Sequence, residues 1–269
     1  MKSSFLDHLV MDNDVLKQFK NLTAKDEKLF YYAFGKLQSR AIAIKKEIQK
    51  NKSIYDYKLG FNTSNADVDI DEIGVVSELE VNVSYDEVKI LNGIERVDKR
   101  NFKTINEKLL KDAWCIWIEE GNNYTGTSLY ERIVFNNDKR RIEVLFTESA
   151  AKLLTIIDDK VSKNGEEKCL GGFAKISINN ICPLKKSYDL KFYLYALTIL
   201  RGNKGCITMS MDGLRGILGP DTIIEDKMFY QRYIKNPAKA INDLNLDIKI
   251  ETERKNKNVF IKVVKRKEI

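Results

Sequence analysis

Near the C-terminal end of the chain, apolar residues recur first at helical spacing and then at strand spacing. Over residues 226–245 they return every three or four positions, which predicts a helix. The predicted packed stripe of this helix is Tyr230, Tyr233, Pro237, Ala240 and Leu244. A second face of the same helix carries Arg232, Lys235, Lys239 and Asn242.

Two alternating stretches follow this helix and predict strands at residues 246–253 and 259–264. The turn between them, residues 254–257, is basic. A helix with one packed and one basic face, followed by a basic-tipped hairpin, is typical of a winged-helix DNA-binding domain. For one helix alone, an ordinary solvated charged face gives the same pattern, so the rest of the chain must distinguish the two.

Polar residues mark the starts of three further helices. Thr23, with Asp26 three residues later, comes close to a capping box, and Ser84 with Glu87 completes one. Ser210 is placed to cap a third helix, which stops at the Gly-Pro pair of residues 219–220.

The order of predicted elements occurs twice along the chain. The first part contains a helix at residues 24–50, a strand at 79–83, helices at 85–91 and 98–112, strands at 114–119, 128–136 and 141–146 with a basic turn at 137–140, and a helix at 147–157. After a glycine-containing junction at residues 158–172, the second part contains a strand at 173–178, a helix at 187–200, an extended segment at 206–209 and a helix at 211–218. We therefore predict an α+β fold with two tandem winged-helix domains, residues 23–157 and 158–269, behind a lead-in at residues 1–22.

The formal net charge of +7 is unevenly spread along the chain. Residues 226–269 hold twelve Lys and Arg against six Asp and Glu, whereas residues 61–80 hold six acids and no Lys or Arg. Basic charge at one end indicates a polyanionic partner, either nucleic acid or an anionic membrane. Trp and Phe lie inside apolar patterns instead of on a basic face, and no apolar run approaches the roughly 20 residues of a membrane helix, so nucleic acid is favoured.

DNA-contacting residues are predicted on one helix and one hairpin tip of each domain. Gln231 and Arg232 suit bidentate contacts to adenine and guanine, whereas lysines suit phosphates. The predicted set in the second domain is Lys227, Tyr230, Gln231, Arg232, Lys235, Lys239, Arg254, Lys255 and Lys257. The corresponding set in the first domain is Lys99, Arg100, Asn101, Lys103, Thr104, Lys139, Arg140 and Arg141. The competing interpretation of the hairpin residues is that such tips are charged simply to stay solvated.

The acidic segment at residues 61–78 matches part of a calcium-binding loop. Asp67, Asp69, Asp71 and Glu78 occupy positions 1, 3, 5 and 12 of an EF-hand pattern. Position 6 is Glu72, where that loop needs glycine for its turn. A solvated acidic loop is therefore favoured, and no metal or other cofactor is expected.

Catalytic motifs are absent from the sequence. The single histidine, His8, has no Cys or Ser motif around it, and the chain has no P-loop, GxGxxG, HxH or HExxH motif. We expect no catalytic residues and no enzymatic activity, with a carboxylate-only metal nuclease using the acidic segment as an open alternative. Cys115, Cys169, Cys182 and Cys206 have no CxxC spacing and are expected to be reduced core residues of a cytoplasmic protein.

A series of stretches in the chain resembles a known family, the winged-helix replication initiator (Rep) proteins of iteron-containing, theta-replicating bacterial plasmids. These stretches are NLT at residues 21–23 before the first long helix, LKKSY at 184–188 running into FYLYAL at 192–197, ITMSMDGLRGILG at 207–219, and residues 229–242, which end in AIN. The resemblance covers about residues 13–264, and the order and spacing of the matches carry it more than any single one.

The resemblance implies two tandem winged-helix domains that bind short direct repeats (iterons) in double-stranded DNA at a plasmid origin. It also implies a monomer that starts replication with host helicase and initiator proteins, and a dimer, made through the N-terminal domain, that represses its own gene. A winged-helix transcription regulator of a phage or chromosome is the alternative with the same fold.

Two features depart from the family pattern, namely the acidic segment at residues 61–78 and Pro237. A proline inside a helix removes one backbone hydrogen bond and is expected to kink the axis. The other interpretation is a new helix with Asn236 as its N-cap and Pro237 as its first residue. We favour one kinked helix with residues 227–235 at the DNA.

Overall fold

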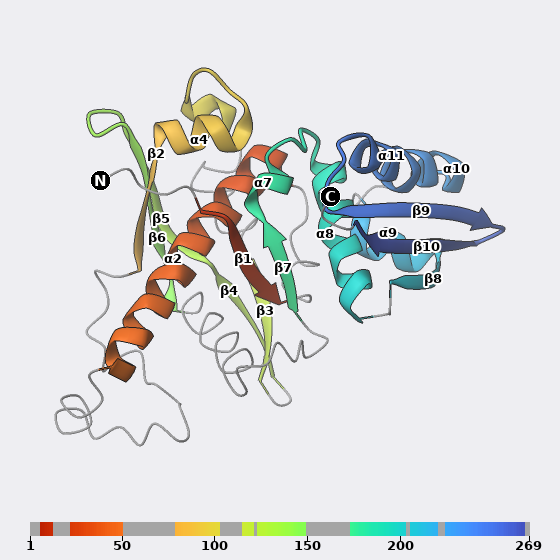
Figure 1. The fold of residues 1–269 in the computed structure, drawn as a ribbon, viewed down its shortest axis with the longest axis horizontal. Coiled ribbons are helices and arrows are strands. Elements are labelled where there is room, and N and C mark those ends of the chain that lie inside the picture. Colours follow the sequence, from red (N-terminus) through yellow and green to blue (C-terminus); the bar gives the residue numbers. More distant parts are fainter. Residues whose placement is uncertain are drawn as a thin grey trace.

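The described part of the chain consists of helices and short antiparallel sheets, which confirms the predicted α+β class (Figure 1). The computed structural model describes residues 6–12, 22–50, 79–102, 115–120, 123–148, 173–202, 205–219 and 224–266. Its first elements are β1 (His8–Asp12), α2 (Ala24–Lys50), β2 (Glu80–Ser84), α4 (Tyr85–Asn92), the 3₁₀ turn η3 (Lys99–Asn101), β3 (Cys115–Glu120), β4 (Asn123–Ser128), β5 (Tyr130–Asn136) and β6 (Arg141–Phe146). These are followed by β7 (Phe173–Ser177), α7 (Ile178–Ile181), α8 (Ser187–Gly202), β8 (Cys206–Ser210), α9 (Met211–Leu218), α10 (Asp226–Phe229), the π-helical segment η5 (Tyr230–Lys235), α11 (Asn236–Asp243), β9 (Ile248–Lys255) and β10 (Asn258–Lys265).

Two three-stranded antiparallel sheets have the same design. Their strand orders are β2-β6-β5 and β8-β10-β9, so in each the strand before a short helix pairs with the last strand of a hairpin. Ser84 pairs with Arg141 in one sheet, and Ser210 pairs with Asn258 in the other. We call α2, β2, α4, β5 and β6 the first half, and α8, β8, α9, α10 to α11, β9 and β10 the second half. The two hairpins, β5–β6 and β9–β10, are the wings, and the predicted tandem winged-helix fold is confirmed.

The short helix of each half begins at the serine that the sequence predicts. Ser84 and Ser210 both have φ −66° and ψ 154°, and each side-chain oxygen accepts the N–H of the residue three positions later. For Ser84 the capping box is complete, because the Glu87 carboxylate also accepts the Ser84 N–H. Thr23 likewise accepts the Asp26 N–H at the start of α2.

The cap of each short helix is joined to the tip of its own wing. Tyr85 donates its N–H to the Arg140 carbonyl at 2.9 Å, and Met211 donates its N–H to the Lys257 carbonyl at 2.8 Å. These two bonds are equivalent, since each links the first helical residue to the residue before the last strand of the hairpin. Each wing tip is thereby fixed relative to its short helix.

Part of the expected lead-in forms a strand. β1 pairs antiparallel with β7 from His8 opposite Ser177 to Asp12 opposite Phe173. In β1, Leu9 and Met11 are buried, as expected for a strand with one packed face. The partner of β1 lies far along the chain, so its pairing cannot be seen in the local sequence.

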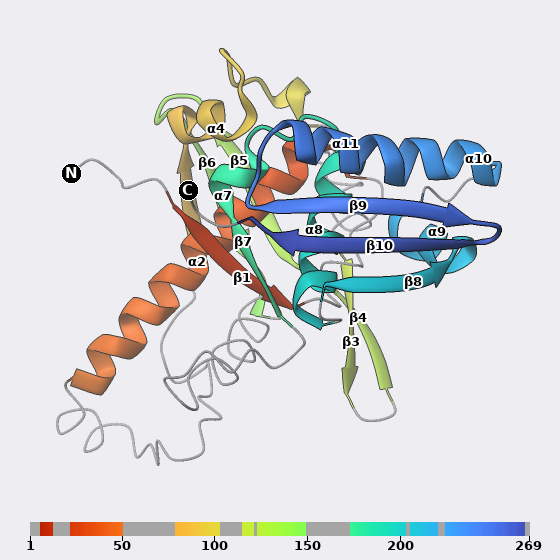
Figure 2. The same ribbon diagram turned by 45° about the vertical axis from the view of Figure 1, so that its right-hand side comes forward.

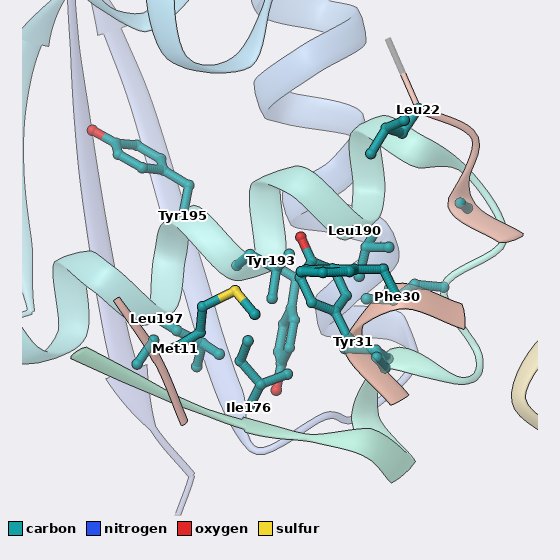
Figure 3. Packing of buried hydrophobic residues seen from close by; sticks show 14 of the residues in the cluster. Met11, Leu22, Phe30, Tyr31, Ile176, Leu190, Tyr193, Tyr195 and Leu197 are labelled. Atoms are coloured by element: carbon teal, nitrogen blue, oxygen red, sulfur yellow. The ribbon is translucent and has the colours of Figure 1, made fainter. Parts of the chain in front are cut away.

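The two halves share a continuous core where α2 and α8 meet β1 and β7 (Figure 3). Met11, Tyr31, Ile176 and Tyr193, which come from these four elements, are each at most 1% exposed. Full burial of one such apolar side chain contributes about 1.5–3 kcal/mol, so this contact has the character of a domain core. The domain boundaries at residues 22 and 157 stay predictions.

Several predicted elements differ from the structure around residues 98–136. The expected helix does not begin at Asp98, because Lys99–Asn101 form only a 3₁₀ turn and Phe102 is extended, with φ −121° and ψ 96°. The strand expected at residues 128–136 corresponds to β5, and it is preceded by an unpredicted strand, β4, which forms a separate two-stranded sheet with β3. The sequence of β4, NYTGTS, contains a glycine and lacks apolar alternation, so it does not predict a strand. The acidic segment at 61–78, residues 103–114 and residues 149–172 lie outside the described residues.

Candidate nucleic-acid interface

The helix expected to read DNA is one continuous helical segment, from Asp226 through η5 to Asp243 (Figure 2). In η5 the backbone hydrogen bonds span five residues, as in the bond from the Asn236 N–H to the Gln231 carbonyl. Pro237, which has no N–H, follows this wide turn and lies in the first turn of α11. Asn236 has helical angles, φ −66° and ψ −44°, so it does not cap a new helix. A π-helical segment accommodates the proline without a break.

The π-helical segment shifts the packed face of this helix. The buried residues are Phe229, Ile234, Pro237, Ala238 and Ile241, and the first two are five positions apart. Of the predicted stripe, Tyr230, Tyr233 and Ala240 are half-buried and Leu244 is exposed. The predicted stripe is therefore only partly right: Pro237 is buried, and Tyr230 and Tyr233 pack against the core while half-buried, but Leu244 is exposed. The stripe assumed α-helical spacing throughout, whereas a π turn holds one more residue.

Opposite the packed face lies a run of polar residues at intervals of four. Lys227, Gln231, Lys235 and Lys239 are all exposed. None of the three lysines forms an ion pair with another residue that the structure describes, whereas the Gln231 amide donates to the Asn236 side chain at 2.7 Å. This run, which we call the polar face, presents three cations and one amide to solvent and suits a DNA groove with phosphates on both sides.

Arg232 and Tyr230 point away from the polar face in two directions. The Arg232 guanidinium lies 5.9 Å from the ring centroid of Tyr188 on α8 and 5.7 Å from that of Tyr233. The Tyr230 hydroxyl lies 3.3 Å from the Thr252 hydroxyl on β9. Tyr230 thus links the helix to its wing, and exposed Arg232 is held by two aromatic rings at the side of the helix nearest α8.

Asn242 does not belong to the basic face on which the sequence placed it. Its amide donates to the Ile250 carbonyl at 2.7 Å, and its side-chain oxygen accepts the Ile250 N–H at 2.9 Å. Both bonds fix the C-terminal end of the helix to β9. The predicted basic face is wrong at this position because spacing alone cannot show which polar side chain meets a strand backbone.

A carboxylate lies between two arginines at the start of the helix. Asp226 accepts from Arg215 of α9 at 2.6 Å and lies 3.6 Å from a guanidinium nitrogen of Arg254 on β9. The hydrogen bond from Arg215 is the main reason why the pKa of Asp226 is lowered, with further lowering by the charges of Arg254 and Lys257. Arg215 also lies 4.8 Å from the ring centroid of Phe229. Sequence analysis missed Arg215 and Asp226, since residues from three separate elements form this cluster.

The tip of the second wing is a two-residue turn at Asn256 and Lys257, so Arg254 and Lys255 belong to β9 instead of the predicted turn. Asn256 has φ 56°, a left-handed conformation that asparagine adopts more readily than most residues. Lys257 is exposed, and Lys255 lies 3.3 Å from the carboxylate of Glu253 on the same strand. In both ribbon views this tip lies at the same end of the molecule as α10 (Figures 1 and 2). The start of the helix and the wing tip therefore lie side by side.

In the first half, two of the predicted DNA-contacting arginines form ion pairs with acidic residues two positions away in the chain. Arg100 donates to Asp98 at 2.6 Å, which holds the pKa of that carboxyl at about 2, and Arg141 lies 2.7 Å from Glu143. Lys139 and Arg140 at the wing tip and Lys99 in the 3₁₀ turn are exposed. The side chain of Asn101, and Lys103 and Thr104 as a whole, lie outside the described residues.

Other predicted features concern metals, cysteines and membranes. Across the described ranges, no group of three or more His, Cys, Asp or Glu residues is placed to hold a metal ion, and the EF-hand-like pattern falls outside them. Cys206 is exposed, so the expectation of a core cysteine is wrong there, whereas half-buried Cys182 packs against the core. His8 lies in β1. No described helix is long and apolar enough to cross a membrane.

Two winged-helix halves joined through one core define a tandem winged-helix protein, a class whose helices and wings are suited to duplex DNA. The fold is similar, over 98% of this chain and 100% of the other, to that of the Pi initiator protein in a crystal structure with iteron DNA. That likeness has a TM-score of 0.57 and 12% sequence identity. No protein-family model and no curated protein matches the sequence.

Proposed function

We propose that this protein is a sequence-specific, double-stranded DNA-binding initiator of plasmid replication that binds iterons at its origin. The observation that carries the proposal is the polar face, Lys227, Gln231, Lys235 and Lys239, next to a basic wing tip. It occurs in a chain whose fold matches, from end to end, an initiator crystallised with iteron DNA. The proposed activity is binding without catalysis.

The second half supplies the main reading surface in this proposal. The helix enters the major groove with its polar face, Gln231 and Arg232 contact base edges, and the lysines contact phosphates. Lys255 and Lys257 of the wing tip lie on the flanking backbone or in the minor groove. Arg232 moves from Tyr188 and Tyr233 onto a base, a small change because its side chain is exposed.

The first half contributes a second contact with Lys139 and Arg140 at its wing tip. The two wing tips lie at opposite ends of the molecule in both ribbon views, so they would contact separate segments of the duplex (Figures 1 and 2). We therefore assign the two halves to successive major grooves of one iteron. Bound monomers would help to open an AT-rich region and recruit host helicase and initiator proteins in the cytoplasm, and a dimer made through the N-terminal domain would repress the gene.

Footprinting on the DNA that flanks the gene tests this function. Protection of a phased array of direct repeats is expected. Protection of a single palindromic promoter site would instead indicate a transcription regulator. Magnesium-dependent cutting without a footprint would overturn DNA reading in favour of a nuclease.

The base-reading role has its own test in Arg232→Ala. This change is expected to cost about 1–3 kcal/mol on the iteron and little on random duplex. Lys249→Ala is the matched control, because it removes an exposed cation from the end of β9 away from the wing tip. Equal losses on both DNAs for Arg232→Ala would refute base reading by this residue.

A further inference from the structure

We call the segment Asp226–Asp243 the reading helix. The acidic residue at its start is in an unusual place for a DNA-binding surface. Asp226 directly precedes exposed Lys227 and is the first residue of α10, which lies at the same end of the molecule as the second wing tip (Figure 2). A carboxylate beside a phosphate backbone is electrostatically unfavourable. A carboxylate in this position therefore opposes DNA binding, so its presence calls for another role.

Asp226 uses its charge to hold two guanidinium groups. One oxygen accepts from Arg215 at 2.6 Å, and the other lies 3.6 Å from Arg254. A guanidinium is a strong bidentate ligand for phosphate. With both arginines on Asp226, two of the most effective phosphate-binding groups at this end of the protein are occupied by an internal partner.

Both arginines also have other contacts on this surface. Arg215 also lies over the Phe229 ring, and Arg254 also donates to the Asn256 carbonyl at 3.0 Å, so each arginine has a second contact that holds it near this surface. The side chains are 41% exposed for Asp226, 23% for Arg215 and 28% for Arg254, so solvent screens these ion pairs in part and limits their contribution to stability. The main effect of Asp226 is therefore expected in DNA binding.

We propose that Asp226 is a specificity-determining residue, which keeps Arg215 and Arg254 from binding the phosphates of any duplex and so lowers affinity for random sequence. On random DNA the protein can bind in whichever register offers the most phosphate contacts. Both released guanidiniums would therefore find a phosphate and raise the affinity. On the iteron, base contacts fix the register, and a released guanidinium adds only what that register offers. Asp226 thereby widens the difference between iteron and random DNA. The inference rests on the proposed function.

The test compares Asp226→Asn with the wild-type protein on iteron and random duplexes over a series of salt concentrations. We expect several-fold tighter binding to random DNA and a smaller iteron-to-random ratio. The slope of log K against log salt on random DNA should steepen by about 0.9 for each further phosphate that a released guanidinium neutralises. Asp226→Glu, which keeps the charge, should restore the wild-type ratio.

Asp243→Asn is the matched control, because it removes the same charge from an exposed site at the other end of the helix. If Asp226→Asn and Asp243→Asn change binding equally, the effect is one of net charge and the proposal is wrong. In an Arg254→Gln background, Asp226→Asn should steepen the slope by only about half as much, because one guanidinium remains to be released. A purely structural role would lower the melting temperature without steepening the slope.

The two levels of inference fail differently. A wild-type protein that protects no repeat overturns the proposed function and the specificity role with it. A wild-type protein that protects the repeats, together with an unchanged slope for Asp226→Asn, overturns only the role of Asp226.

Discussion

The two winged-helix halves have the same backbone frame and are stabilised by different polar contacts. Their sheet orders correspond, their cap serines share the same φ and ψ, and each wing tip accepts a hydrogen bond from the first residue of its short helix. They differ three residues after the cap serine, where the first half has Glu87 and the second has Gly213.

In the first half, Glu87 ties the short helix to the long one. Its carboxylate accepts from Tyr32 at 2.8 Å and from Lys36 at 2.9 Å, both on α2, besides the Ser84 N–H. Burial alone would raise the pKa of Glu87, but the hydrogen bonds from Lys36, Ser84 and Tyr32 outweigh it and lower the pKa. The short helix of this half is thus fixed to the shared core.

In the second half, the short helix is tied to the reading surface instead. Gly213 carries no side chain, and a Cβ there would lie 3.0 Å from Met209. The polar link of α9 is made by Arg215, which reaches Asp226 on the reading helix. The comparison indicates that the polar contacts of the first short helix hold it to the shared core, whereas those of the second hold it to the helix proposed to contact DNA.

The largest expected effect that tests this comparison is on folding of the first half. Glu87→Ala removes the carboxylate that accepts hydrogen bonds from Tyr32, Lys36 and Ser84, which should lower the free energy of unfolding by about 3 kcal/mol. Denaturant unfolding measures the change. Asp86→Ala, at the exposed neighbouring position, should change stability by less than about 0.5 kcal/mol. Similar losses for both variants would show that the Glu87 network is unimportant.

Asn242→Ala tests how the reading helix of the second half is held. The change removes two hydrogen bonds to the Ile250 backbone and should cost about 2 kcal/mol in unfolding free energy. Asp243→Ala serves as the control on the same turn. A loss of iteron discrimination at full stability would instead indicate that Asn242 contacts DNA.

The contact between the halves should make stability depend on pH through Glu27. Burial is the main reason why the pKa of Glu27 rises to about 8. The charge of Lys191 and the hydrogen bond from Ser187 lower this pKa, and the charge of Asp26 raises it slightly. Because the pKa is higher in the folded state than in the unfolded one, the contribution of Glu27 is complete below about pH 4.5 and is lost as pH rises toward 8. The loss is at most about 1.4 kcal/mol per pH unit.

Glu27→Gln should flatten this fall between pH 5 and 8, measured by denaturant unfolding at several pH values. Burial also lowers the pKa of neighbouring Lys28 to about 8. Because this pKa is lower in the folded state, Lys28 adds stability only as pH rises above about 8, so it does not mask the fall caused by Glu27. Glu95→Gln, on the exposed surface, is the control. Parallel pH profiles for wild-type and Glu27→Gln proteins would contradict the prediction.

The smallest expected effect compares the DNA contacts of the two halves. Lys235→Ala, on the polar face, and Lys139→Ala, at the first wing tip, should each reduce the salt slope of iteron binding by about 0.9 and cost less than about 1 kcal/mol. Equal effects would mean that both halves touch phosphates. An effect of Lys235→Ala alone would restrict DNA contact to the second half.

Sequence patterns predicted the frame well because that frame depends on neighbours in the chain. A serine cap and its partner three residues later lie within one helical turn, so Ser84 with Glu87 and the cap at Ser210 could be identified directly. Alternation over a few residues likewise revealed the wings. All four residues of the polar face were among the predicted candidates because of their polarity, although the spacing placed Lys235 and Lys239 on one face with Arg232 and Asn242.

The remaining features depend on contacts between distant residues and on backbone geometry that local spacing does not encode. β1 has a strand pattern of only five residues and is recognisable through its pairing with β7. The packed stripe, by contrast, was partly misplaced because η5 inserts π-helical turns ahead of Pro237. Contacts between near neighbours in the chain thus account for the helix caps and the two wings of this protein. Long-range packing determined which helix face meets the core, how the halves join and which arginines Asp226 holds, because each of these outcomes brings together residues far apart in the chain.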